Sequence, residues 1–586
     1  MRYHRKEGSG RGFWGAFFGT IVGMIALILI VSAAIYLKAN ETSKIEKHSY
    51  LVVDLYGEVF EYDPPGDIMS EIVGGDAETL QRILDSLEKV SVDDRIDGVI
   101  IKMSANMRTG GGMLEEMRSA IKKVRDGGKK VYGFADSMER GTVYLAAACD
   151  SVFAPRDAYI GFRGFDVTTT HVRGTLDKLG INPNLHRIKD YKSAAEVVTR
   201  KDLSPEAKEN LQWILDEVWG GMLEVLRDDR GLAEDDVLAL MRYAAFTSEE
   251  AKEGGLIDEV LYWDELENRL KREGDDELRT VSQCRYSDEA REDLGLKGKK
   301  KIAVIHAQGT IGGRENKVDP LLGIMMGHET IVGELRRAQE DEDIAAIVFR
   351  VDSGGGDALT SDLIGHQVEV TSHDKPVVVS MVNVAASGGY HISYRASKIV
   401  ADRMTITGSI GSISGKFNIR GFHDKLGITH DSVSKGPMAR MWSGYRDFTP
   451  DERERFEQNH WDGFNTWLAD VADHRGMSFE EAEKLAHGRV WTGVQAKANG
   501  LIDEVGGLDK AIDVAKELAE IPADEKVTVL HFPEKQGFLE IILGGGGDVS
   551  AAVRWVLYRF IRDELAETWR LMTETPLYMT EPVEIQ

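Results

Sequence analysis

The chain has 586 residues, of which 42% are hydrophobic and 29% charged, and its formal net charge is −26. That length is too great for one hydrophobic core, so we expect two or more domains. The negative charge argues against nucleic acid as a partner, because phosphates require a basic surface. Two cysteines, no Cys/His metal spacing and no Gly-x-x-x-x-Gly-Lys loop predict neither a metal centre nor a cofactor.

An uncharged apolar segment at residues 12–37 is the first feature along the chain. It is long enough to cross a bilayer as a helix. Four basic residues lie within residues 1–11, which favours a cytoplasmic N-terminus. A cleaved signal peptide is the alternative, but its apolar region is normally shorter. We therefore expect a retained transmembrane anchor, with the rest of the chain outside the cytoplasm.

Strand-like and helix-like segments alternate after the anchor. Residues 49–57 and 98–103 are typical of strands, and residues 78–87 have the apolar spacing of a helix. This alternation predicts an α/β fold, in which βαβ units build a parallel sheet covered by helices.

The same order of segments recurs in the second half of the chain. Asp177-Lys-Leu-Gly-Ile recurs at Asp424, and Gly255-Leu-Ile-Asp-Glu-Val recurs at Gly500, at offsets of 247 and 245 residues. Matched blocks in one order at nearly one offset indicate a tandem duplication. We expect the first repeat at 45–284, a charged linker at 285–299 and the second repeat at 300–520.

The C-terminal part, residues 521–586, holds two further features. Residues 527–532 are expected to form an edge strand, and apolar positions between 553 and 565 have helical spacing. We expect this amphipathic stripe to pack on the protein itself or on a neighbouring subunit.

Ser409 stands in a glycine frame in the second repeat. Gly408 and Gly411 flank it, and glycine lets backbone N–H groups come close to a ligand. The first repeat keeps the two aligned glycines, but Phe162 stands in the place of the serine. Ser409 is therefore a candidate nucleophile.

Lys192 shows the converse pattern. It lies in the first repeat, and its aligned position falls on or beside Ala439 in the second. A lysine can act as the general base for a serine if burial lowers its pKa from about 10.4 towards 7–8. The alternative is an ordinary surface lysine beside Asp190. One composite site between the repeats would explain why each copy lacks what the other kept.

Together these motifs resemble the bacterial signal peptide peptidases of the long, duplicated type, the SppA or protease IV family. The resemblance covers about residues 45–520 and rests on Tyr191-Lys-Ser-Ala, Ala385-Ala-Ser-Gly-Gly-Tyr, Thr407-Gly-Ser-Ile-Gly and Val490-Trp-Thr-Gly. It implies two Clp/crotonase-like ββα domains, a nucleophile at Ser409, a general base at Lys192 and a homo-oligomer, expected to be a tetramer.

Two further segments bear on the site. Ser353-Gly-Gly-Gly replaces the Ser-Pro-Gly-Gly usual in that family, and Gly355 and Gly356 can still offer N–H groups to an oxyanion. Ser387 is the alternative nucleophile, since Clp proteases place their serine at the matching position and pair it with a histidine further on. The stretch where that histidine would fall contains none. We therefore expect Ser387 to begin a helix, with its hydroxyl capping backbone N–H groups.

The residues and the resemblance together predict a membrane-anchored serine endopeptidase at the extracytoplasmic (periplasmic) face of the bacterial inner membrane. It would hydrolyse apolar peptides, such as released signal peptides, through an acyl-enzyme on Ser409. A crotonase-type acyl-CoA enzyme shares the fold, but it needs neither an anchor nor a Ser/Lys pair split between repeats. A catalytically inactive membrane scaffold is the second alternative.

Overall fold

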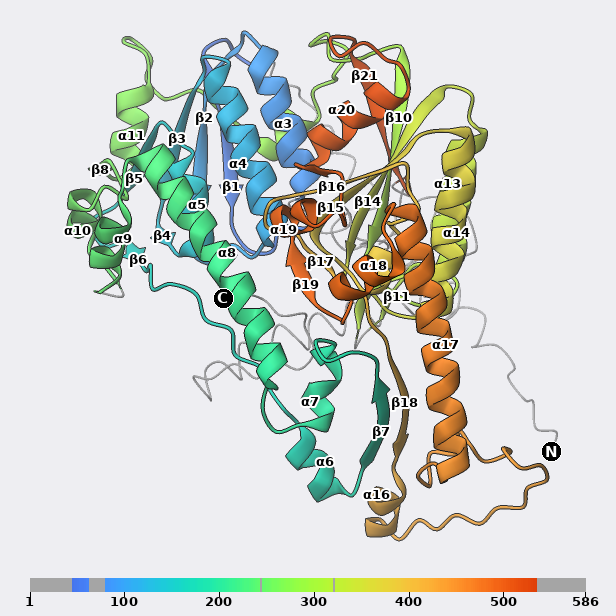
Figure 1. Ribbon diagram of the computed structural model, residues 1–586. Helices are drawn as coiled ribbons and strands as arrows, with labels where there is room; N and C mark the ends of the chain where they lie inside the picture. Colours follow the sequence, from blue (N-terminus) through green and yellow to red (C-terminus); the bar gives the residue numbers. More distant parts are fainter. Residues whose placement is uncertain (1–44, 63–78, 243–244, 320–321, 535–586) are drawn as a thin grey trace, which may run out of the picture.

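The computed structural model describes residues 45–62, 79–242, 245–319 and 322–534 (Figure 1). The expected anchor at 12–37 and the amphipathic stripe at 553–565 lie outside these ranges. Within them, no helix has both the length and the apolar character needed to cross a membrane.

The first repeat is built on a six-stranded sheet in which every strand pair is parallel. Its order is β8 (Glu259–Val260), β5 (Ser151–Ala154), β3 (Lys130–Ala135), β2 (Ile96–Met103), β1 (Ser49–Leu55) and β9 (Thr280–Ser282). Val99 and Ile101 face one helical layer and Ile100 faces the other. Both faces are covered, which explains the continuous apolar run in β2.

Helices of the first repeat pack on both sides of this sheet. One face carries α3 (Leu80–Val92), α4 (Gly111–Asp126), α5 (Arg140–Ala147) and α8 (Pro205–Arg230), and the other carries α11 (Trp263–Leu270). Smaller elements are β4 (Ser137–Met138), β6 (Tyr159–Ile160), α6 (Arg173–Leu179), α7 (Glu196–Thr199), α9 (Glu234–Met241) and α10 (Ser248–Glu253).

The second repeat has the same strand order. Its strands β21 (Val527–Phe532), β10 (Lys300–Gln308), β14 (Ile344–Ser353), β15 (Val377–Ala386), β16 (Lys398–Ala401) and β20 (Glu504–Val505) follow one another across the sheet, as β9, β1, β2, β3, β5 and β8 do in the first. β21 is an edge strand, as expected. β17 (Ile406–Gly408) also pairs with β15, and β19 (Val490–Thr492) pairs with β17 antiparallel.

The helices of the second repeat form two layers as well. α13 (His328–Glu340), α14 (Ala358–Asp374) and α17 (Pro450–His474) share one core with the sheet, and α20 (Leu508–Leu518) covers the opposite face. The remaining elements are β11 (Thr310–Ile311), β12 (Lys317–Asp319), β13 (Gly323–Met326), α15 (Gly388–His391), α16 (Arg420–Lys425), α18 (Phe479–Leu485) and α19 (Gly493–Ala498).

The segment expected as a charged linker, residues 285–299, is packed against the first repeat. It overlaps α12 (Gln283–Ser287), in which Tyr286 is fully buried, and Leu296 is buried further on. Arg291 pairs with Asp85 of α3 at 2.5 Å. The charges in this stretch are therefore partly paired with α3, which is why a charge-rich sequence forms ordered structure here.

Two strands, one from each repeat, pair beyond the main sheets and join the repeats. β7 (Asn182–Arg187) runs antiparallel to β18 (Ile413–Asn418) (Figure 1), and His186 of β7 contacts His460 of α17 at 2.9 Å. The pairing continues past the strands, because the Ile188 N–H donates to the Ser412 carbonyl at 2.8 Å. Lys192 follows β7 and Ser409 precedes β18, so this cross-repeat pair brings both candidates to one place.

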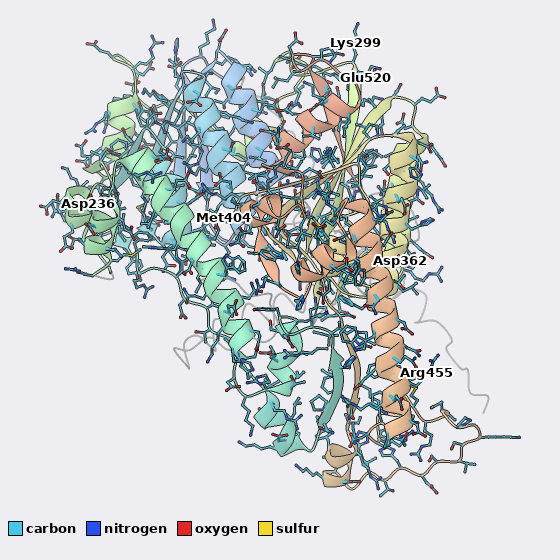
Figure 2. All side chains as sticks on the ribbon, in the orientation of Figure 1. Asp236, Lys299, Asp362, Met404, Arg455 and Glu520 are labelled. Atoms are coloured by element: carbon cyan, nitrogen blue, oxygen red, sulfur yellow. The ribbon has the colours of Figure 1, made fainter. Side chains whose placement is uncertain are left out.

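A second contact between the repeats lies where the sheet of the second repeat packs against α4 and the core of the first. Met404 of the second repeat packs against the core of the first (Figure 2). The Asn383 side chain accepts a hydrogen bond from the Met113 N–H at the start of α4, at 3.2 Å. Arg350, fully buried on β14, pairs with Glu61 at 2.9 Å and with Glu116 at 2.6 Å, both from the first repeat. These contacts fix how the two repeats lie against each other.

Candidate functional site

Lys192 and Ser409 meet in the structure although 217 residues separate them in the sequence. The Lys192 Nζ lies 2.9 Å from Ser409 Oγ and 2.8 Å from the Ser409 carbonyl oxygen. A third oxygen, Ser387 Oγ, lies 2.9 Å from the same nitrogen. One amine from the first repeat is thus surrounded by three oxygens of the second.

Lys192 is buried, with 6% of its surface exposed. Burial lowers the pKa of its amine to about 7, because the charged form loses its hydration inside the protein. This environment differs from that of the surface lysine that was the alternative. The amine therefore changes protonation state near neutral pH, as a general base should.

Ser409 sits in a strained turn after β17. Its φ is +51°, a conformation that non-glycine residues seldom adopt, and Gly408 before it has φ +80°. A Cβ on Gly408 would come within 2.7 Å of the Trp491 ring, so this position needs glycine on two counts. The Ser409 N–H donates to the Arg489 carbonyl at 2.7 Å. In the first repeat, the aligned Phe162 is fully buried in the core.

Ser387 does not have the role expected from the sequence. It precedes α15 as predicted, but its hydroxyl makes no capping hydrogen bond and contacts Lys192 Nζ instead. The reason is its backbone, since φ +56° and ψ −115° turn the side chain away from the helix N–H groups. An N-cap needs an extended backbone to fold its side chain back onto the helix.

The glycine loop after β14 also differs in part from the expectation. The Gly355 N–H donates to Ser353 Oγ at 3.1 Å, so in this conformation it is not free to meet an oxyanion. Within the described ranges, the Gly356 N–H has no acceptor. A Cβ placed on Gly388 would lie 3.0 Å from the Gly356 nitrogen, so Gly388 closely approaches this loop. In the described part of the chain the Gly388 N–H also has no recorded acceptor, so the Gly356 and Gly388 N–H groups are both available here.

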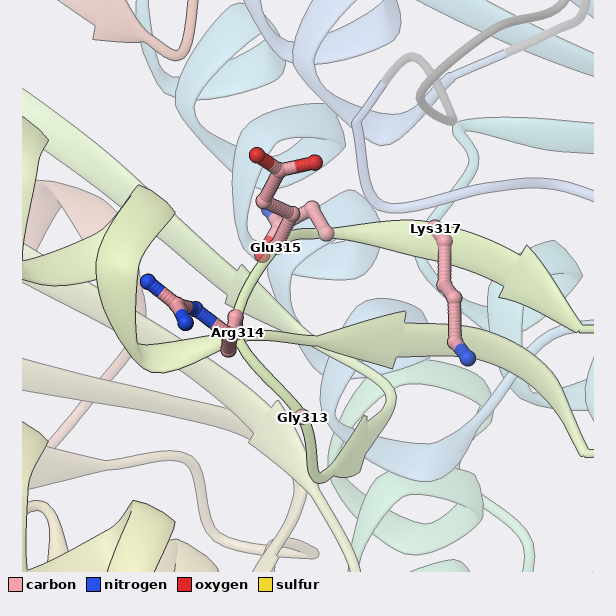
Figure 3. Close-up of a pocket in the computed structure, with 5 residues that line it drawn as sticks. Gly313, Arg314, Glu315 and Lys317 are labelled. Atoms are coloured by element: carbon pink, nitrogen blue, oxygen red, sulfur yellow. The ribbon is translucent and has the colours of Figure 1, made fainter. Parts of the chain in front are cut away.

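A separate surface pocket lies on the turn between β11 and β12 (Figure 3). Gly313, Arg314, Glu315, Asn316 and Lys317 line it, and none of them contacts Lys192 or Ser409. In the part of the chain that the structure describes, no group of three His, Cys, Asp or Glu side chains is arranged to hold a metal ion.

Comparisons with known proteins match the chain twice to one family. The model of "Peptidase family S49" matches residues 123–276 and again residues 369–522. The matches begin 246 residues apart (369 − 123), which agrees with the duplication seen in the sequence and in the strand order.

Curated relatives match over most of the chain. It is 34% identical to "Serine protease SPPA, chloroplastic" of Arabidopsis thaliana, over 84% of this chain and 73% of that protein. It is 28% identical to "Protease 4" of Salmonella typhi, over 84% of this chain and 82% of that protein. A shorter match, 31% identical over 37% of this chain and 63% of the other, is to "Putative signal peptide peptidase SppA" of Enterococcus faecium.

Proposed function

Because the chain belongs to peptidase family S49 and is a serine protease, we propose that Ser409 is its nucleophile and Lys192 its general base. The observation that carries this proposal is the 2.9 Å contact between Ser409 Oγ and a buried lysine amine. Each repeat, proposed at 45–284 and 300–520, supplies one half of the pair.

The three contacts of Lys192 define how a neutral amine would be oriented. A neutral amine has two N–H donors and one lone pair. The Ser409 carbonyl can only accept, so it takes one N–H, and Ser387 Oγ takes the other. The lone pair then faces Ser409 Oγ and accepts its hydroxyl proton. Ser387 thus orients the base in this mechanism.

The reaction then follows the chemistry of an acyl-enzyme. Ser409 Oγ attacks the scissile carbonyl carbon while its proton passes to Lys192. The resulting ammonium returns that proton to the leaving amine as the peptide bond breaks. Water, deprotonated by the same lysine, then attacks the ester and releases the acid, with the proton restoring the Ser409 hydroxyl. The N–H groups of Gly356 and Gly388 are the proposed donors to the oxyanion.

Replacing Ser387 with alanine should lower kcat about 10-fold and leave KM within about twofold. The loss corresponds to one hydrogen bond of roughly 1.4 kcal/mol that orients the base. Ser387→Cys should restore part of the activity, because its thiol is a weak hydrogen-bonding group and it lacks the branched Cβ that the φ of +56° would disfavour. Steady-state kinetics at saturating substrate would measure both variants. Loss of activity as complete as in Ser409→Ala would contradict a role limited to orienting the base.

The proposed substrates are apolar peptides such as released signal peptides. Support comes from the Enterococcus faecium relative and from the uncharged segment at 12–37, which would hold the enzyme at the membrane where such peptides lie. The full-length enzyme in detergent should hydrolyse a synthetic signal peptide at least about 10 times faster, in kcat/KM, than a scrambled polar peptide of equal length. That ratio is the discrimination that roughly 1.4 kcal/mol of apolar binding provides. Equal rates on both peptides would exclude this substrate preference.

We further propose a single anchor with a cytoplasmic N-terminus, an extracytoplasmic body and assembly into a homo-oligomer. The basic residues before the apolar segment support this topology. Protease added to intact spheroplasts should digest the chain from about residue 45 onward. Protection of the body until the membrane is broken would reverse the proposed orientation.

A further inference from the structure

Residues 487–490, which follow α18 and end on the first residue of β19, lie in contact with both members of the proposed pair. On the side of the first repeat, the Tyr191 N–H donates to the His487 carbonyl at 2.9 Å. On the side of the nucleophile, the Arg489 carbonyl accepts the Ser409 N–H at 2.7 Å, and the Gly488 N–H donates to the Ile410 carbonyl at 2.8 Å. One short segment therefore bonds to the residue before Lys192 and to Ser409 itself.

Gly488 is the residue of this segment that packs directly against the backbone of Lys192. A Cβ there would lie 2.4 Å from the backbone nitrogen of Lys192 and 2.6 Å from its Cα. Neither backbone atom can rotate away as a side chain could. Gly488 is buried and has φ +77°, a conformation suited to glycine. The absent side chain therefore lets the Lys192 backbone come directly against the second repeat.

The segment is also fastened to α8 of the first repeat. The buried Asn210 side chain donates to the Val490 carbonyl at 3.0 Å and accepts the Val490 N–H at 3.0 Å. The Arg489 guanidinium lies over the Tyr191 ring, 4.1 Å from its centroid, and 4.9 Å from that of Trp213. These contacts tie the segment to the repeat that carries the lysine.

Backbone strain gathers around this segment. Six non-glycine residues with positive φ are recorded in the described chain, and four of them (Lys189, Ser387, Ser409 and His487) lie at or next to the pair. Such conformations are unfavourable for residues with a side chain and persist only where surrounding contacts impose them. The cross-repeat hydrogen bonds are the contacts that impose them here.

We propose that residues 487–490 form a positioning bridge that sets the separation of Lys192 and Ser409, with Gly488 as its critical residue. None of these side chains touches the reacting oxygen or nitrogen, so they act through the pair. This inference rests on the proposed Ser/Lys mechanism and adds a determinant of its geometry. The bridge explains how two residues from different repeats keep hydrogen-bond distance.

Replacing Gly488 with alanine should push the lysine away from the serine. We expect kcat to fall about 100-fold, since a displacement near 1 Å at a catalytic group costs that much, and KM to stay within about twofold. The matched control is Gly476→Ala, because Gly476 also has positive φ, +63°, but no atom lies within 4 Å of its Cβ position. The control should keep kcat within about twofold.

The pH profile separates positioning from simple destabilisation. A displaced, better hydrated Lys192 should have a higher pKa, so the acid limb of kcat should move to higher pH in Gly488→Ala and stay in place in Gly476→Ala. The charged groups around it are Lys189 and Asp190 in its own loop and Glu483 on α18. His487 and Arg489 lie in the bridge itself, and Glu209 lies on α8. Arg187 of β7 and Glu196 of α7 pair with each other at 2.6 Å. Lys189 pairs with Glu483, and Arg489 lies 3.4 Å from Glu209. These partners are the same in both variants.

A second pair of variants covers the case in which Gly488→Ala fails to fold. Asn210→Leu removes both hydrogen bonds to Val490, and Gln367→Met removes a buried amide between α13 and α14, away from the site. Asn210→Leu should lower kcat about 10-fold with the same shift of the acid limb, and Gln367→Met should do neither.

The outcomes distinguish this inference from the mechanism on which it rests. One outcome would reject the positioning bridge and keep the Ser/Lys pair. In that outcome, Ser409→Ala and Lys192→Ala are inactive, while Gly488→Ala and Asn210→Leu match their controls in kcat and in the midpoint of the acid limb. Activity retained in Ser409→Ala would overturn the pair itself, whatever the bridge variants show.

Discussion

Replacing Ser409 with alanine should lower kcat for peptide hydrolysis by at least about 10⁴-fold and leave the protein folded. Removing a serine nucleophile abolishes the acyl-enzyme route, and only oxyanion stabilisation and substrate binding remain. The backbone contacts of Ser409 do not need its hydroxyl, because they use its N–H and its carbonyl. Circular dichroism and the melting temperature of the purified variant would check the fold beside the kinetics.

Covalent labelling offers an independent check of the same prediction. A fluorophosphonate should modify the unaltered protein at Ser409 and should not label Ser409→Ala. Ser412→Ala is the matched control, since Ser412 lies three residues further on and its hydroxyl contacts His460 at 2.8 Å. This control should label and hydrolyse within about twofold of the unaltered protein. Labelling of Ser387 in place of Ser409 would assign the nucleophile to Ser387. A protein that is not labelled at all would favour a catalytically inactive scaffold.

Both Lys192→Ala and Lys192→Arg should lower kcat by roughly 10³-fold or more. General-base catalysis contributes about 10²–10⁴-fold, and a guanidinium cannot release its proton in the working range. Lys189→Arg is the matched control, since Lys189 lies three residues away and its charge pairs with Glu483 and faces the Trp461 ring, 5.6 Å from its centroid. Activity in Lys192→Arg close to that of the unaltered enzyme would exclude proton transfer by this residue.

The pH dependence follows from the lowered pKa of Lys192. Below about pH 7 its amine is protonated and cannot accept the serine proton, and above that value it is neutral. Activity should therefore rise as pH increases through about 7 and then level off. An acid limb near pH 10, the range of a hydrated lysine, would contradict a buried base.

Co-assembled variants test whether one chain supplies both residues. The 2.9 Å contact lies within a single chain, so oligomers mixed from Ser409→Ala and Lys192→Ala chains should show no recovery. Every site would then lack one partner. Recovery of roughly a quarter of full activity would instead indicate a site shared between subunits.

The sequence by itself was sufficient to identify the fold class, the duplication and both members of the proposed pair. The alternation of strand and helix patterns is local, and a duplicated chain provides its own comparison. Phe162 opposite Ser409, and Lys192 opposite Ala439, showed which positions had diverged. Residue type and spacing carry this information, so it can be read without coordinates. The edge position of β21 was predicted for the same reason.

Only the tertiary structure decided how the pair is held together and which neighbours complete it. The contact of Ser387 with Lys192 spans 195 residues and depends on a positive φ that no sequence pattern signals. The Gly355 N–H was expected to be free, but it is taken up by Ser353 two residues away. Gly488 contacts Lys192 because β7 and β18 pair across the repeats. Such contacts arise from the packing of segments that are distant in the sequence. The free energy of that packing depends on the whole interface, so no short stretch of sequence predicts it.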